Sequence, residues 1–120
     1  MNNFYENMVL LLPTLSEEEV QEAINKISSF IVENGGEVLK VDNWGKRKLA
    51  YKLNKQTMGY YVLFLFKAPA SLIRKIEEFY RVYENVFKFM ILKLTKHQIA
   101  SLPPEIKGIP IEHSELTSKV

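Results

Sequence analysis

The sequence predicts an α+β fold built from four strands and two helices. Two stretches carry apolar residues at the three- and four-residue spacing of an amphipathic helix, and four other stretches are short, apolar and extended in character. They follow one another as strand, helix, strand, strand, helix, strand. This order is typical of the split βαβ, or ferredoxin-like, arrangement (βαββαβ), in which two helices cover one face of a four-stranded antiparallel sheet.

The first strand is predicted over residues 4–12, where an apolar run stops at Pro13. Ser16 and Glu19 then predict a capping box, because the serine hydroxyl can accept from a free amide of the first turn while the glutamate reaches back. The helix that follows is expected to end at the Asn-Gly-Gly of residues 34–36, which tolerate the left-handed conformation of a last turn. Its expected buried stripe comprises Val20, Ala23, Ile24, Ile27, Phe30 and Ile31.

The middle of the chain is predicted to form a β-hairpin. Residues 37–53 are extended in character and are interrupted by a bend or bulge at Trp44 and Gly45. The hairpin loop is expected at residues 56–59, and the next strand at residues 60–67.

A second helix and a fourth strand complete the predicted domain. Pro69 can occupy the first turn of a helix without losing a hydrogen bond, and Asn85 is expected to cap the end of that helix. Residues 86–94 are predicted to form the last strand. The expected division is a ferredoxin-like domain at residues 1–95 and an extended or disordered C-terminal tail at residues 96–120, which is rich in proline and polar residues. The apolar stripe of the second helix comprises Leu72, Ile76, Phe79 and Tyr83.

Composition narrows the class of protein. The 120 residues are 47% apolar and 25% charged, which is ordinary for one globular domain. There is no cysteine, the two histidines are too few for a metal cluster, and no apolar run is as long as a membrane span. We therefore expect a cytoplasmic protein that has no metal, cofactor, small-molecule substrate or membrane contact and that is not an enzyme.

The uncovered face of the predicted sheet is expected to be apolar. Residues 60–66 and 8–12 are apolar at both alternating sets of positions, and residues 86–94 are interrupted only by Lys88 and Lys93. A strand with one solvated face normally alternates, so something is expected to cover this face. A partner protein, a nucleic acid or the tail could do so, although central strands also tolerate some exposed aromatic residues.

Positive charge is concentrated in one block. Residues 46–60 hold five basic residues and no acidic one, whereas the whole chain carries a net charge of only +2. Such a block indicates one positive patch. Lysine and arginine contact phosphates, and an exposed tyrosine can stack on a base, but a charged edge strand can also serve only to prevent aggregation. Strand alternation puts Arg47 and Tyr51 on one side, opposite Lys46, Lys48 and Lys52.

The same stretch resembles the signature of a known family, the bacterial-type small-subunit ribosomal protein S6 family. The resemblance covers residues 4–95. Lys52 departs from it, because that position is often proline, and Leu53 stands where isoleucine is more frequent. Its central motif comprises Trp44, Gly45, Arg47, Leu49, Ala50 and Tyr51. Weaker matches are Tyr5, Glu6, Pro13, Gly59, Tyr60 and Asn85.

The resemblance implies a structural component of the small ribosomal subunit. Members bind the central domain of small-subunit rRNA as a heterodimer with ribosomal protein S18, so the expected partners are that RNA and that protein, on ribosomes of bacterial type. Arg47 and Lys48 match paired basic residues that face rRNA in the family, and Lys88 matches another commonly basic position. The expected RNA-binding residues are Lys46, Arg47, Lys48, Tyr51, Lys52 and Lys88.

Other ferredoxin-like proteins offer alternative interpretations. An RRM-like RNA binder would need an RNP-like strand, which residues 59–62 match only loosely. An acylphosphatase-like enzyme would need an anion-binding loop after the first strand, but residues 12–15 contain neither glycine nor arginine. A ligand-sensing regulatory domain that dimerises through its sheet would explain the apolar face but not the basic block.

Overall fold

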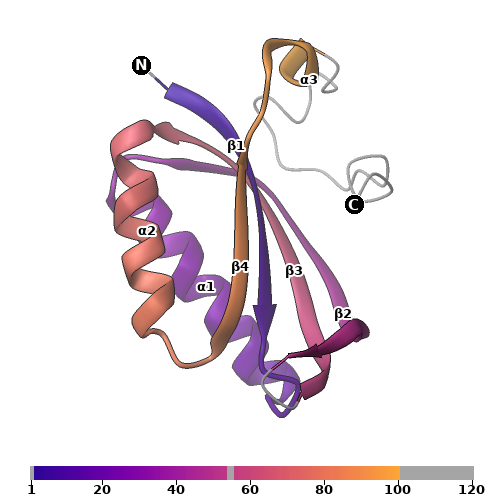
Figure 1. Ribbon diagram of the computed structural model, residues 1–120. Helices are drawn as coiled ribbons and strands as arrows, with labels where there is room; N and C mark the ends of the chain where they lie inside the picture. Colours follow the sequence, from indigo (N-terminus) through magenta and orange to yellow (C-terminus); the bar gives the residue numbers. More distant parts are fainter. Residues whose placement is uncertain (1, 54–55, 101–120) are drawn as a thin grey trace.

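Four strands form one antiparallel sheet in the order β2-β3-β1-β4, and helices α1 and α2 cover one of its faces (Figure 1). This confirms the predicted ferredoxin-like fold and places β2 and β4 at the two edges. The structure is a computed structural model and describes residues 2–53 and 56–100. Its elements are β1 (Asn2–Leu11), α1 (Glu17–Glu33), β2 (Glu37–Leu53), β3 (Gln56–Pro69), α2 (Ala70–Val82), β4 (Val86–Lys93) and α3 (Lys96–Ala100).

Helix α1 begins and ends where local sequence signals place its ends. The amide of Glu19 donates to the Ser16 hydroxyl at 3.1 Å, and the amide of Ser16 donates to the Glu19 carboxylate at 2.8 Å, which confirms the capping box. After the last turn, Gly35 adopts a positive φ of 93°. The predicted stripe is buried except for Phe30, which is partly buried and stacks on Phe79 of α2 with ring centroids 4.6 Å apart.

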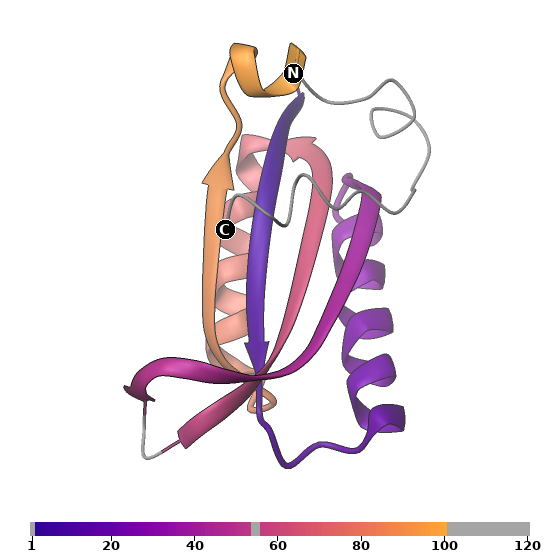
Figure 2. The same cartoon turned by 90° about the vertical axis from the view of Figure 1, so that its right-hand side faces the viewer.

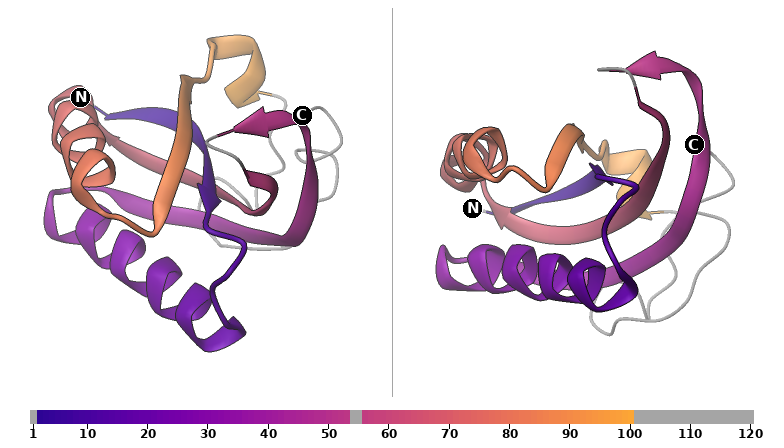
Figure 3. Two further views of the ribbon diagram at one scale, coloured as in Figure 1. Left: turned by 60° about the horizontal axis from the view of Figure 1, so that its bottom comes forward. Right: turned by 90° about the horizontal axis from the view of Figure 1, so that it is seen from below.

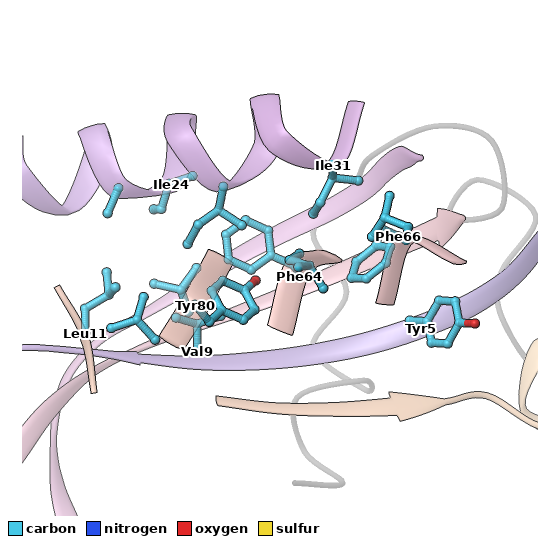
Figure 4. Close-up of a cluster of buried hydrophobic side chains, with 14 of the residues drawn as sticks. Tyr5, Val9, Leu11, Ile24, Ile31, Phe64, Phe66 and Tyr80 are labelled. Atoms are coloured by element: carbon cyan, nitrogen blue, oxygen red, sulfur yellow. The ribbon is translucent and has the colours of Figure 1, made fainter. Parts of the chain in front are cut away.

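The main core lies between the sheet and the two helices. Figure 4 shows the side chains of Ile24, Phe64 and Tyr80 pointing into this space. In α2 the buried positions are Leu72, Ile76 and Tyr80, which are four residues apart, whereas the predicted Phe79 and Tyr83 are only partly buried. Burial raises the pKa of the Tyr80 phenol above its usual value, because the charged form would lose its hydration.

Two predicted boundaries are wrong. Residues 56–59 do not form a loop but the start of β3, where Gly59 pairs with Arg47 and Met58 pairs with Lys48. Asn85 does not cap α2, because the helix ends at Val82, followed by Tyr83 in the C-cap position. The Asn85 carbonyl instead accepts a hydrogen bond from the amide of Leu12 at 3.0 Å.

A short helix follows β4. Thr95 and Gln98 hydrogen bond reciprocally at its start, with donor–acceptor distances of 2.7 and 3.2 Å. Ile99 then packs against a buried cluster that comprises Leu39, Leu65 and Leu94. The segment predicted to be an extended tail therefore begins with one helical turn. Residues 101–120 lie outside the described residues, so the division at residue 95 stays a prediction.

Candidate nucleic-acid interface

The hairpin of β2 and β3 is longer than the rest of the sheet. β2 has 17 residues and β3 has 14, whereas β1 has 10 and β4 has 8. The far end of the hairpin curves across the ends of β1 and β4 on the open side of the sheet, away from the helices (Figures 2 and 3). We call this part the basic hairpin; it comprises residues 44–53 of β2 and residues 56–61 of β3.

A bulge at Trp44 and Gly45 marks the beginning of the basic hairpin. Asn43 pairs with Val62 and Gly45 pairs with Tyr61, which leaves Trp44 as the extra residue. Gly45 has a positive φ of 81°, and its amide donates to the side-chain oxygen of Asn43 at 2.9 Å. This confirms the bend or bulge expected at this position.

Apolar contacts hold the curved end against the sheet. Leu49 is buried together with Met8, Leu10 and Leu63, and Phe87 packs against this cluster. Gly59 permits the close approach, because a Cβ atom added there would lie 3.2 Å from the Phe87 ring. The centre of the open face is therefore covered by the hairpin itself. The sequence predicted instead that a partner protein, a nucleic acid or the tail would cover it.

Arg47 is exposed on the basic hairpin and is held in place by Trp44. Its Nε–H donates to the Trp44 carbonyl at 3.2 Å, and its guanidinium carbon lies over the Trp44 ring, 5.5 Å from the centroid. Trp44 in turn stacks on Tyr61, with centroids 6.1 Å apart and an interplanar angle of 12°. The guanidinium thus faces solvent in a restrained position.

Lys46 and Lys48 lie on the opposite side of β2 from Arg47. Both are exposed, and the ammonium of Lys46 lies 5.8 Å from the ring centroid of Tyr60, its register partner. Tyr51 and Lys52 belong to the same strand, but their side chains lie outside what the structure describes. Three of the predicted residues are therefore consecutive cations that project to both sides of one strand.

Lys88 lies on β4, at the other edge of the sheet. It pairs with Leu10 and is half-buried. Because the preceding Phe87 touches Gly59, the curvature of the hairpin brings the start of β4 to the basic hairpin. The sequence could place Lys88 near the other cations only through the family resemblance.

The groove beside the basic hairpin does not have the composition of a reaction centre. It has a volume of about 440 Å³ and is lined on the polar side by Glu17, Gln21, Asn43 and Tyr60. One carboxylate, two amides and a phenol do not pair a nucleophile with a base. Within residues 2–53 and 56–100, no three metal-ligating side chains gather at one place. None of the described helices combines the length and apolar character needed to cross a membrane.

The fold and the basic hairpin together define a ferredoxin-like protein whose candidate site is a binding surface. Comparison with known proteins identifies the family. The family model of ribosomal protein S6 matches residues 4–93. The small ribosomal subunit protein bS6 of Thermoanaerobacter pseudethanolicus is 42% identical over 89 residues, which cover 74% of this chain and 94% of that protein. The bS6 protein of Campylobacter lari is 39% identical over 113 residues, which cover 93% of this chain and 91% of that protein.

A solved structure agrees with these relatives. The crystal structure of 30S ribosomal protein S6 from Thermotoga maritima superposes with a TM-score of 0.75 and 27% identity, covering 78% of this chain and 89% of that chain. The chain belongs to the ribosomal protein S6 family. It is a structural, non-enzymatic protein of the bacterial-type small ribosomal subunit, and is associated with ribosomes in the cytoplasm. Membership of this family replaces the alternative interpretations as an acylphosphatase-like enzyme or a ligand-sensing regulatory domain.

Proposed function

We propose that the protein binds the central domain of small-subunit rRNA as a heterodimer with ribosomal protein S18. The observation that supports the RNA contact best is the presentation of Arg47, which is exposed and yet restrained against Trp44. Lys46 and Lys48 project from the other side of the strand. Cations on both sides of β2 can contact phosphates of two RNA backbone segments that lie on either side of this protein strand.

The RNA contact is expected at the basic hairpin rather than at the centre of the sheet. An RRM-like binder stacks bases on aromatic residues of its open face. Here Met8, Leu10 and Leu63 at the centre of that face are buried under Leu49, and Tyr61 is already stacked on Trp44. The arrangement therefore favours phosphate binding by the hairpin.

The protein partner is expected at the remaining apolar surface of the open side. Met90 and Leu92 on edge strand β4 are 50% and 52% exposed. Met90 pairs with Met8 and Leu92 with Glu6, so both belong to the same face as the covered cluster. Exposed apolar side chains of this kind suit a protein rather than a phosphate backbone. We assign this surface, the β4 patch of Met90 and Leu92, to ribosomal protein S18.

A salt titration tests the RNA contact. With a fragment of the central domain and S18 present, binding that neutralises about four phosphates gives a slope of log affinity against log salt near −3, at about 0.7–0.9 per phosphate. Replacing Lys46, Arg47 and Lys48 together by alanine should reduce the slope by about two to three. A matched change of Arg74, Lys75 and Arg81, three exposed cations of α2, should leave the slope unchanged. A flat salt response of the wild-type protein would contradict the proposal.

A further inference from the structure

Trp44 and Arg47 meet only because the strand is bulged between them. In a regular strand, successive side chains alternate between faces, so residues three apart point to opposite sides. The extra residue at the bulge, together with the positive φ of Gly45, places Trp44 on the side of Arg47 and Leu49. The contact is therefore a product of backbone geometry and not of simple sequence proximity.

Trp44 is itself fixed, so it can hold another side chain. One contact of its ring is the stack on Tyr61, and it packs against the cluster of Met8, Leu10, Leu49 and Leu63. Its carbonyl and its ring both engage Arg47, the first through Nε and the second through the guanidinium. Nε is occupied by the Trp44 carbonyl and Arg47 is exposed, so the two Nη groups are the donors left for a ligand from solvent.

Among residues 2–53 and 56–100, no carboxylate forms an ion pair with Arg47. The pairs of Lys40 with Asp42 and of Lys67 with Glu37 lie elsewhere. A planar guanidinium with two outward N–H groups matches two oxygens of a phosphate, and restraint before binding reduces the conformational entropy lost on binding.

We propose that Trp44 is a positioning residue for Arg47, holding its guanidinium as a preformed fork for one RNA phosphate. This proposal rests on the proposed function, in which Arg47 contacts rRNA. Trp44 acts through Arg47 and makes no contact of its own with the RNA. Its effect on affinity therefore depends on the presence of the arginine.

A double-mutant cycle tests this dependence. RNA affinity is measured at one salt concentration, with S18 present, for the wild type, Trp44→Leu, Arg47→Ala and the double variant. Arg47→Ala should lower affinity about tenfold or more, as the loss of a charged hydrogen-bonded contact does. Trp44→Leu should lower it about two- to fivefold in the wild-type background and not at all in the Arg47→Ala background.

The outcomes separate the two proposals. Equal loss from Trp44→Leu in both backgrounds would show an independent contact, such as a base stacked on Trp44, and would overturn the positioning role alone. No loss from Trp44→Leu in the wild-type background would overturn it as well. No loss from Arg47→Ala would instead remove Arg47 from the RNA-binding site of the proposed function.

A second variant avoids the packed ring if Trp44→Leu lowers the melting temperature. Arg47→Lys retains the positive charge but has no Nε–H to donate to the Trp44 carbonyl and no planar fork. It should lower affinity several-fold, toward that of Arg47→Ala, while the salt slope stays at the wild-type value. Wild-type affinity in Arg47→Lys would show that charge alone suffices and would overturn the positioning role.

Discussion

At the scale of single residues, the buried pair of Tyr80 and Asn7 connects three elements. The Tyr80 hydroxyl donates to the side-chain oxygen of Asn7, whose amide nitrogen donates to the Met90 carbonyl at 2.9 Å. Asn7 has no exposed surface, and Tyr80 is 1% exposed. The pair therefore joins α2 to β1 and β4 in surroundings where water cannot replace a lost partner.

Tyr80→Phe should lower the free energy of unfolding by about 1–3 kcal/mol, because it leaves the Asn7 oxygen buried without a donor. Urea denaturation at neutral pH measures this. The matched control is Tyr83→Phe, whose hydroxyl is partly exposed and accepts only a long 3.4 Å bond from Asn85. The control should change stability by less than about 0.5 kcal/mol. Equal effects of the two changes would show that the hydrogen bond from Tyr80 to Asn7 does not stabilise the fold.

The same variant should show a distinct pH dependence. Burial raises the pKa of the Tyr80 phenol, so the folded state keeps this proton at a pH where the unfolded state loses it. Below about pH 10 both states hold the proton and this group adds no pH dependence; above it, the group lowers wild-type stability by up to about 1.4 kcal/mol per pH unit. Tyr80→Phe has no phenol to titrate, so it lacks this loss of stability. The difference in unfolding free energy between the wild type and Tyr80→Phe should therefore shrink between about pH 10 and 11.5. A constant deficit would contradict the prediction.

At the scale of elements, the bulge in β2 decides which side chains the basic hairpin presents. Gly45→Ala tests it cleanly, because a Cβ atom there meets nothing within 4 Å and only the positive φ opposes the change. We expect a loss of about 1–2 kcal/mol in unfolding free energy, together with weaker RNA binding as Arg47 separates from Trp44. Gly45→Asn is the control, since asparagine tolerates a positive φ. This variant should retain most of the stability and most of the RNA affinity. If the two variants lose stability and RNA affinity equally, the positive φ of Gly45 is not what the alanine variant disturbs.

The sequence predicts what depends on near neighbours. The Ser16–Glu19 capping box and the bulge at Gly45 are local signals, and both are found. The burial of Tyr80 rather than Phe79 and Tyr83 could not be decided from spacing, because positions three, four and seven residues after Ile76 all continue a helical stripe. The sequence predicts a loop at residues 56–59, whereas Gly59 lies in β3, where its missing side chain admits the Phe87 ring from a strand far along the chain.

The candidate site was predictable in part for the same reason. The basic block is visible as composition, and it indicates Lys46, Arg47 and Lys48; all three are exposed, while their contact with RNA stays a prediction. The division of these cations between two sides of β2 also follows from alternation. The contact between Arg47 and Trp44 does not, because it needs the bulge to reverse the alternation by one residue.

At the scale of the whole molecule, apolar side chains remain exposed on both sides. The β4 patch lies on the open side, while Val32 and Val82, which are 58% and 82% exposed, lie on α1 and at the end of α2. The helix-side pair sits apart from the basic hairpin, whereas the β4 patch lies on the same side as Arg47. The proposed heterodimer therefore predicts unequal sensitivity of the two pairs.

Changing Met90 and Leu92 to serine should weaken association with S18 by about tenfold or more, since apolar contact area is lost from the interface. Changing Val32 and Val82 to serine should leave that association unaltered. Isothermal titration of the purified proteins without RNA measures both, and circular dichroism checks that each variant is folded. If the helix-side pair proves the more sensitive one, S18 binds to the other face and the assignment of the β4 patch is wrong.

The position of β1 at the centre of the sheet also has a consequence for synthesis of the chain. β1 is made first, but its two neighbours are β3 and β4, which begin at Gln56 and Val86. At about 5–20 residues per second, the first neighbour is completed roughly 3–12 seconds after β1, and the second later still. Helix α1 can form in the meantime, because its hydrogen bonds are local. β1, one of the two central strands of the finished sheet, is thus the strand that waits longest on the growing chain to be paired.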